Sequence, residues 1–188
     1  MAYLSEKQMH EFGFKSLGKN VKISDKASIY EPEKIEIGDN SRIDDFCLVS
    51  GRVVIGRNIH ITPYCNLAGG EKGIYIDDFS TLAYGVNVFT QSDDYLGFTM
   101  TNSTIPQKYK KEKKEAVYIQ KHVIVGAGSY ILPGVTLSVG TSVGAMSLIL
   151  ASTKPWMVYI GIPACAIKNR KKDLLVLEKQ YLDELKGK

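Results

Sequence analysis

The sequence of 188 residues predicts an all-β solenoid, a coil of short parallel strands, and three observations support this prediction. Branched aliphatic residues recur every six positions along most of the chain. A second class of residues, small or β-branched, recurs four positions after the aliphatic ones. Glycine directly follows the aliphatic residue at several of these positions. Neither the 3.6-residue period of an α-helix nor the two-residue period of an isolated strand produces such a pattern.

The aliphatic series advances in steps of six residues, with one step of nine and one long interruption. Its members are Ile37, Ile43, Val49, Ile55, Ile61, Leu67, Ile76, Leu82, Val88, Ile119, Val125, Ile131, Leu137, Val143 and Ile149. Each six-residue segment is expected to form one side of a three-sided coil, with the aliphatic side chain pointing inward. Stacked turns of the coil then pair their strands at about 4.8 Å and bury the aliphatic side chains in columns.

The narrow interior of such a coil leaves room only for a smaller side chain beside each aliphatic one. The residues expected there are Ser41, Cys47, Val53, Ile59, Cys65, Ser80, Val86, Ser92, Val123, Ser129, Val135, Thr141 and Ser147. Cys47 and Cys65 are therefore interpreted as buried packing thiols. Together with Cys165 they match no zinc-binding spacing, and three scattered cysteines suit a reducing compartment.

The repeat divides the chain into three parts. Residues 1–20 are expected to form an N-terminal helical segment, and residues 21–171 the solenoid domain with a loop at 94–116. Residues 172–188 are expected to form a C-terminal helix.

Both terminal helices show sequence signals of their own. The first is expected over residues 4–12 and ends at Gly13, a residue that commonly terminates helices. The second is expected over residues 172–185 and carries one apolar stripe, which we interpret as core or subunit packing. The stripe consists of Leu174, Leu177, Tyr181 and Leu185.

The composition is that of a globular protein, with 44% hydrophobic and 23% charged residues and a net charge of +4. No apolar run approaches the roughly 20 residues of a membrane span, and the first residues lack the apolar segment of a secretory signal. Basic residues gather at 108–114 and 168–172. Because no nucleic-acid-binding motif accompanies them, they favour small anionic ligands. We expect a cytoplasmic protein without nucleic-acid or membrane partners.

Four segments resemble the hexapeptide-repeat acyltransferases, which fold as left-handed parallel β-helices. They read IGDNSRID, IGRNIHITPY, VIVGAGSYILPGVTL and VGTSVGAMSLILASTKPWMVYIGIPACAIK, and the resemblance covers residues 21–172. It is greatest to the galactoside, maltose and xenobiotic acetyltransferases and to the sugar acetyltransferases of surface-polysaccharide synthesis. The GIPA segment after a Lys-Pro turn is its most specific part. The left hand is implied by the resemblance alone, because parallel crossovers are normally right-handed.

The resemblance implies a homotrimer that uses acetyl-CoA as co-substrate and no metal. In this family acyl-CoA lies in grooves between subunits, where backbone N–H groups hold it and stabilise the developing oxyanion. The cofactor-binding residues that the resemblance implies are Gly126, Ala127, Gly144, Ala145, Lys154, Pro163, Lys168 and Arg170. The basic residues after GIPA are expected to meet the CoA phosphates.

The six-residue register is interrupted between Val88 and Ile119 by the segment DDYLGFTMTNSTIPQKYKKEKKEAVY. A long loop on a rigid solenoid is usually functional. In the resembling enzymes the start of this loop carries the catalytic histidine, whereas this chain has Asp93 at that position and Asp94 beside it. A carboxylate is a weaker base than imidazole near neutral pH, so it favours an amine acceptor over a hydroxyl. The alternative is a turn in which these carboxylates accept backbone N–H groups.

The third catalytic candidate is His122, which follows the loop and could reach an acceptor across a subunit boundary. Four further side chains are expected to contact the acceptor, namely His60, Asn66, Tyr84 and Tyr95. No motif in the sequence encodes the identity of that acceptor.

The expected function is acetyl transfer from acetyl-CoA to a sugar, most simply an amino sugar, in surface-polysaccharide or nucleotide-sugar synthesis. Two alternatives stay open: a sugar O-acetyltransferase with His122 as base, and a non-catalytic solenoid scaffold. The γ-type carbonic anhydrases share the solenoid but need three zinc-binding histidines. The histidines of this chain are too scattered for such a site, since they are His10, His60 and His122.

Overall fold

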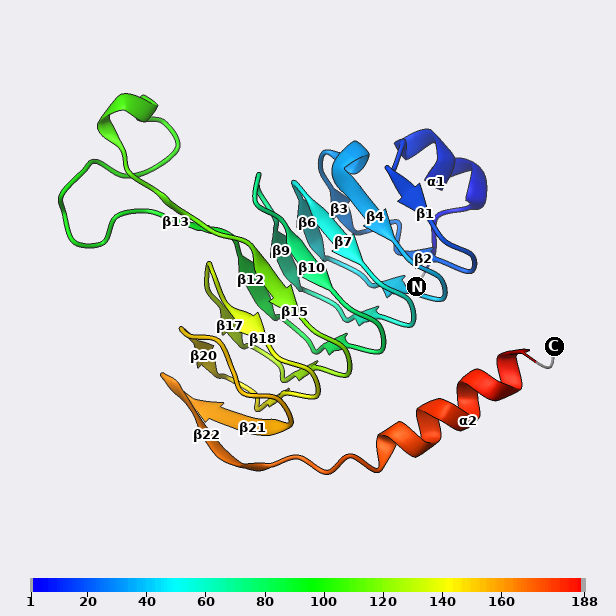
Figure 1. The fold of residues 1–188 in the computed structure, drawn as a ribbon. Coiled ribbons are helices and arrows are strands. Elements are labelled where there is room, and N and C mark those ends of the chain that lie inside the picture. The colour runs from blue at the N-terminus through cyan, green and yellow to red at the C-terminus, as the bar shows by residue number, and fades with distance from the viewer. Residues whose placement is uncertain (1, 187–188) are drawn as a thin grey trace.

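The computed structural model of the protein describes residues 2–186, and it is a left-handed parallel β-helix with a short helix at each end (Figure 1). The chain winds through three sheets in turn, so that strands separated by about one turn pair in parallel and in register. The fold class predicted from the six-residue period is therefore confirmed.

Three parallel sheets form the sides of the coil. The first contains β1 (Ser16–Leu17), β4 (Ile35–Ile37), β7 (Val53–Ile55), β10 (Ile74–Ile76), β15 (Val117–Ile119) and β18 (Thr136–Leu137). The second contains β2 (Lys22–Ile23), β5 (Arg42–Ile43), β8 (His60–Ile61), β11 (Thr81–Leu82), β16 (Ile124–Val125), β19 (Ser142–Val143), β21 (Met157–Gly161) and the antiparallel β22 (Ala164–Asn169). The third contains β3 (Ser28–Ile29), β6 (Leu48–Ser50), β9 (Asn66–Ala68), β12 (Asn87–Phe89), β17 (Tyr130–Ile131) and β20 (Leu148–Ile149).

The interior of the coil is filled by the side chains that the period marks. Every aliphatic residue of the predicted series is at most 3% exposed. The predicted small residues beside them are also buried, including Cys47 and Cys65 at 1% exposure each. Ser92 is the exception, and its prediction was wrong: it lies in β13 (Gln91–Ser92), outside the coil. The six-residue spacing reaches this residue by coincidence, because the chain has already left the solenoid.

The sheets meet at three corners. The first corner joins the first and second sheets, the second corner joins the second and third, and the third corner joins the third and first. Most of the tight turns at the first two corners place one residue at positive φ. At the first corner these residues include Asn40, Asn58, Phe79, His122 and Trp156. At the second corner they are Phe46, Tyr64, Gly85, Gly128 and Met146.

The loop predicted from the broken register leaves the coil at the third corner, between β12 and β15. Its two ends pair as an antiparallel ribbon of β13 and β14 (Lys113–Lys114), and its far part contains the short helix η2 (Gln107–Tyr109). Figure 1 shows that this insert projects away from the solenoid. Lys113 fixes its base, because the Nζ atom donates to the carbonyl of Pro133 at 3.0 Å.

Both predicted helices are present. α1 (Glu6–Phe12) begins at a capping box formed by Ser5 and Gln8 and ends at Gly13. The first strand, β1, already follows inside the segment expected to be helical, and a short helix η1 (Pro32–Lys34) precedes β4. α2 (Leu174–Lys186) follows a stretch of chain that leads away from β22 (Figure 1). Among residues 2–186, neither helix is long and apolar enough to cross a membrane.

Candidate functional site

A smooth wall of glycine and alanine lies on the second corner of the last turns. Gly126 and Ala127 lie beside Gly144 and Ala145, and the backbone N–H of Met146 donates to the carbonyl of Ala127 at 2.8 Å. A Cβ atom on Gly126 would lie 2.4 Å from the backbone nitrogen of Ala145, so only glycine allows this close approach. The structure thus brings four of the expected cofactor-binding residues together on one outer surface.

The remaining expected cofactor residues divide between two places. Pro163 continues the second corner between β21 and β22, and Lys168 is exposed on β22. Lys154 instead lies just before the first corner, and its backbone N–H donates to the Tyr159 hydroxyl at 2.9 Å. Arg170 is committed to the fold, as its Nη1 donates to carbonyls of the first corner, at 2.6 Å to that of His122. Burial lowers the pKa of this guanidinium, and its role is to tie the chain after β22 to the coil.

The two aspartates at the start of the insert differ in how their carboxylates are used. Asp94 accepts hydrogen bonds from the backbone N–H groups of Leu96 and Thr99, each at 2.8 Å. These bonds, with that from Leu96 foremost, lower the pKa of Asp94. Asp94 is therefore a turn-forming carboxylate, the alternative that its sequence context left open. Asp93 accepts one long hydrogen bond within residues 2–186, at 3.4 Å from the backbone N–H of Asn102.

The surroundings of Asp93 combine exposed apolar side chains with the charged residues 111–113. Tyr95, Leu96 and Phe98 are 90%, 81% and 83% exposed, and they border an open depression of about 500 Å³ together with the two aspartates. Monomeric proteins seldom leave such a group of large apolar side chains in water. This surface, with Asp93 half-buried at its edge, is suited to contact with another molecule.

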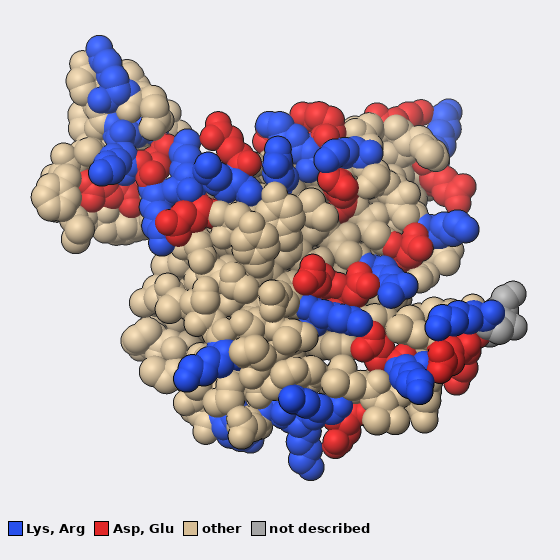
Figure 2. Space-filling model, in the orientation of Figure 1, with Lys and Arg blue, Asp and Glu red and all other residues tan. Residues whose placement is uncertain are grey.

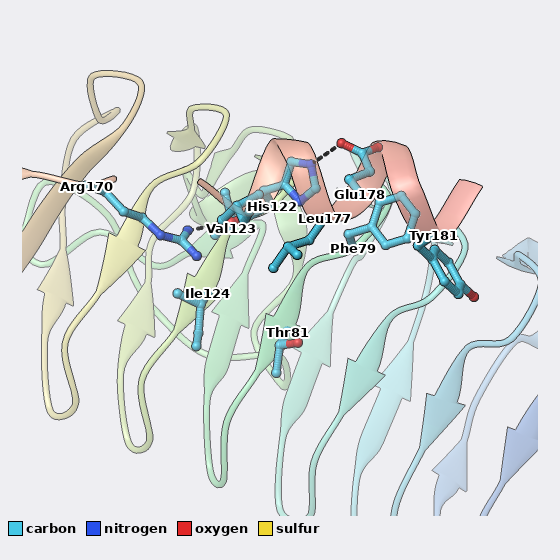
Figure 3. A pocket seen from close by; sticks show the side chains of 10 residues that line it. Phe79, Thr81, His122, Val123, Ile124, Arg170, Leu177, Glu178 and Tyr181 are labelled. Atoms are coloured by element: carbon cyan, nitrogen blue, oxygen red, sulfur yellow. Dashed lines mark hydrogen bonds and ion pairs between the residues drawn. The ribbon is translucent and has the colours of Figure 1, made fainter. Parts of the chain in front are cut away.

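His122 lies at the first corner, on the side that α2 covers (Figure 3). Its Nε2 is 2.8 Å from Glu178 Oε2, its ring stacks on Phe79, and it is only 7% exposed. Burial raises the pKa of Glu178, but hydrogen bonds from Lys121 and His122 outweigh that effect and lower it. A pocket of about 350 Å³ lies between α2 and the coil. Its lining includes Phe79, His122, Leu177, Glu178 and Tyr181. The geometry gives His122 the role of anchoring α2.

The expected acceptor-contacting residues are dispersed in the single chain. His60 lies on the outer face of the second sheet, with its Nε2 2.9 Å from Asp44. Asn66 lies on the third sheet, and its Oδ1 is buried without a hydrogen-bond partner among the described residues. Tyr95 belongs to the insert. Tyr84 alone borders the cofactor wall, because its carbonyl accepts from the N–H of Gly128 at 2.8 Å.

Asp93 and the glycine–alanine wall therefore lie at different corners of one chain, separated by the third sheet. Two exposed aromatic residues of the second corner, Phe46 and Tyr64, were not among the residues predicted from the sequence. Their signal was available, because both precede the inward-pointing cysteines by one residue and so fall at a corner. Figure 2 shows that charged side chains are sparse over the C-terminal turns of the face in view and gather on the insert and the N-terminal turns.

Comparisons with known proteins agree with this architecture. No protein-family profile matches the sequence. The chain is 43% identical over 184 residues to the dTDP-4-amino-4,6-dideoxy-D-glucose acyltransferase of Escherichia coli, covering 96% of this chain and 95% of that protein. It is 44% identical, with a TM-score of 0.97, to AntD, an N-acyltransferase from Bacillus cereus in complex with dTDP and 3-hydroxybutyryl-CoA, each chain covered to 98%. An AntD variant in complex with dTDP-4-amino-4,6-dideoxyglucose and coenzyme A is equally similar, with a TM-score of 0.95, 44% identity and 97% of each chain covered.

Proposed function

This chain belongs to the hexapeptide-repeat sugar acyltransferases, and from that premise we propose that it transfers an acyl group from acyl-CoA to the amine of a dTDP-linked 4-amino-4,6-dideoxy sugar. The observation that carries the proposal is the match along 96% of the chain to an enzyme of that activity. The aspartate at the start of the insert supports it independently, because a carboxylate suits an amine acceptor better than a hydroxyl.

The reaction needs little chemistry from the protein beyond positioning. The neutral amine attacks the thioester carbonyl, a C–N bond forms, the C–S bond breaks, and CoA leaves as the thiol after the amine loses its proton. Asp93 is proposed to accept a hydrogen bond from the amine and to hold it toward the thioester. Backbone N–H groups at Ala127 and Ala145 are proposed to hold the pantetheine arm along the wall. Acetyl is the simplest acyl group for this site.

We propose that the complete site forms between copies of the chain in a homotrimer. Asp93 and the wall lie at different corners of one chain, and the insert projects from its corner with Tyr95, Leu96 and Phe98 exposed. In a closed ring of three copies, the insert of one chain can lie over the wall of its neighbour. Each site then takes its carboxylate from one chain and its CoA surface from the next.

The reaction is proposed to occur in the cytoplasm, during synthesis of a nucleotide sugar for surface polysaccharide. Three cysteines that form no disulfide within residues 2–186 suit that reducing compartment.

O-acylation with His122 as base is the second candidate. The contact between His122 Nε2 and Glu178 of α2 disfavours this role for His122. A direct assay of CoA thiol release decides between the two, with dTDP-4-amino-4,6-dideoxyglucose and the matched 4-hydroxy sugar as acceptors. We expect release with the amino sugar and none above background with the hydroxy sugar. The reverse preference would refute the proposal.

A further inference from the structure

The second corner carries a column of exposed aromatic side chains on the N-terminal side of the wall. Phe46 and Tyr64 form this column and are 52% and 62% exposed, and Tyr84, the residue before Gly85, lies beside the column and is 60% exposed. Phe46 and Tyr64 occupy equivalent positions in successive turns, and their rings stack with centroids 5.2 Å apart and an interplanar angle of 19°. The spacing of the coil therefore sets rings at this corner one above the other.

The column stops at a vacant position. Gly85 is the equivalent residue of the next turn, with φ of 66°, and a Cβ atom there would have nothing within 4 Å. One turn further on, a Cβ atom on Gly128 would meet the Sδ atom of Met146 at 2.5 Å, so that position is covered. The position beside Gly85 is thus open, one turn after Tyr64 and one turn before Gly128, and we call this open position the Gly85 slot.

The aromatic residues are held at positive φ at a conformational cost. Phe46 and Tyr64 have φ of 59° and 67°, a region that bulky residues avoid. Asparagine adopts it more readily and is used at the first corner by Asn40 and Asn58. Phe79 also adopts it, but its ring stacks against His122 and meets Tyr181 of α2. At the second corner the Nζ atom of Lys26 lies 5.7 Å from the centroid of the Phe46 ring, and Phe46 stacks on one side of Tyr64. Tyr64 is nevertheless 62% exposed, so packing within residues 2–186 accounts for only part of this arrangement.

We infer that the Gly85 slot binds the pyrimidine base of the nucleotide-sugar substrate, stacked on Tyr64 as Tyr64 stacks on Phe46. This inference rests on the proposed function and adds to it a recognition site for the nucleotide. A planar ring fits where the coil spacing already supports ring stacking, and base–aromatic stacking is a strong source of affinity for bases. The slot adjoins the wall proposed for CoA, so a substrate held there lies close to the proposed acyl donor.

The test uses dTDP as the probe and isothermal titration calorimetry as the measurement. Tyr64→Ala is expected to weaken dTDP binding by about fivefold to 150-fold, the range for loss of one stacked base. Tyr64→Phe is the matched control, and it should bind dTDP within about threefold of the wild type because the ring is kept. Neither change should alter CoA affinity or the oligomeric state.

A second variant fills the slot with a side chain of the protein itself. Gly85→Tyr places a ring in the vacant position, and the turn can accept it because Tyr64 has nearly the same φ. This variant is expected to abolish measurable dTDP binding while the fold, followed by circular dichroism, is retained. The two variants together separate the loss of a stacking partner from the filling of the slot.

The outcomes distinguish this inference from the function it rests on. If the wild type neither binds dTDP nor releases thiol with the amino sugar, the proposed function fails. If the wild type does both, and Tyr64→Ala and Gly85→Tyr bind dTDP within twofold of it, the slot assignment alone is overturned. The assignment is also overturned if Tyr64→Ala dissociates the oligomer, because the column then packs between subunits. It is overturned as well if Tyr64→Ala weakens CoA binding and leaves dTDP binding unchanged, because the column then contacts the cofactor.

Discussion

Two adjacent aspartates show how neighbouring residues of one type acquire different roles. Asp94 is saturated by backbone N–H groups of its own turn, and those bonds lower its pKa. Asp93 is half-buried, and its carboxylate accepts a single long hydrogen bond from within residues 2–186. A carboxylate with spare acceptor capacity beside an exposed apolar surface is available to a ligand, whereas a saturated one is not.

Replacement of Asp93 by Asn tests that difference. We expect Asp93→Asn to lower kcat/KM for the amino sugar by about 100-fold or more, because it removes the charge and keeps the shape. Asp94→Asn is the control. We expect it to make the insert more sensitive to limited proteolysis and to lower kcat/KM by less than Asp93→Asn does. A fall of less than about threefold for Asp93→Asn would contradict the assigned role.

A second carboxylate, Asp44, links stability to pH. It is 2% exposed, and although burial raises its pKa, hydrogen bonds from Arg42 and His60 lower it below the ordinary value. Because the folded-state pKa is the lower one, the stabilisation is complete above the unfolded pKa and is lost as pH falls through the folded pKa. Asp44→Asn should therefore destabilise the protein at pH 7 by about 2 kcal/mol.

The same variant should flatten the loss of stability below about pH 4, where the unfolded carboxyl begins to bind its proton. Urea unfolding at a series of pH values measures both effects. An unchanged acid dependence in Asp44→Asn would show that other carboxylates dominate the acid transition.

At the scale of elements, α2 depends on a few polar contacts to stay on the coil. Glu178 contacts Lys121 and His122, and the Tyr181 hydroxyl donates to Asn58 at 3.3 Å. No described residue of α2 is fully buried, and Leu177 remains 64% exposed. A helix held in this way is expected to detach locally before the solenoid unfolds.

Glu178→Gln should loosen α2 without harming catalysis. Glu178 and His122 are 12% and 7% exposed, so removal of the Glu178 charge leaves a nearly buried His122 without its ion-pair partner, at a cost of about 2 kcal/mol. Hydrogen exchange in residues 174–186 should become faster, while kcat/KM stays within about twofold of the wild type because the proposed site lies at other corners. A collapse of activity together with faster exchange would return His122 to the catalytic candidates.

The sequence predicts the strands of the solenoid and their inward-pointing residues, because both follow the six-residue period. The aliphatic positions were all predicted correctly, because one inward side chain per side is a geometric requirement of the coil. Ser92 was misplaced because the spacing carries no sign of where the chain leaves the coil. The surroundings of His122 were not predictable, since the period places it at a corner but does not reveal that α2 lies over that corner. The period likewise does not reveal that Arg170, which is expected to meet the CoA phosphates, bonds carbonyls of the coil.

For the whole molecule, the unpaired surfaces point to assembly. Leu96 and Phe98 of the insert are 81% and 83% exposed, and Tyr118 on the first sheet is 46% exposed and stacked on Tyr75. Few charges lie over the C-terminal turns of the face shown in Figure 2. The proposed homotrimer would also bring Asp93 of one copy to the glycine–alanine wall of the next. No single-chain pattern could have paired these two parts of the site, because their proposed contact is between copies.

Mixed trimers test this shared site. Asp93→Asn and Ala145→Trp, which blocks the wall, should each be inactive when assembled alone as trimers by sedimentation equilibrium. After the two are unfolded together and refolded as an equal mixture, about a quarter of the sites should combine an intact insert with an intact neighbouring wall. Activity should recover to about that fraction of the wild type. Sedimentation as a stable monomer, or no recovery in mixed trimers, would place the site within one chain.

The central claim is that the enzyme makes an amide on an amino sugar, and the bond in the product tests it most directly. Wild-type protein is incubated with acetyl-CoA and equal concentrations of dTDP-4-amino-4,6-dideoxyglucose and its 4-hydroxy counterpart, and the products are treated with hydroxylamine before mass spectrometry. Hydroxylamine cleaves esters and leaves amides intact. We expect a single acetylated product, derived from the amino sugar and resistant to the treatment. An acetylated product that hydroxylamine removes, or one formed only from the hydroxy sugar, would contradict the claim.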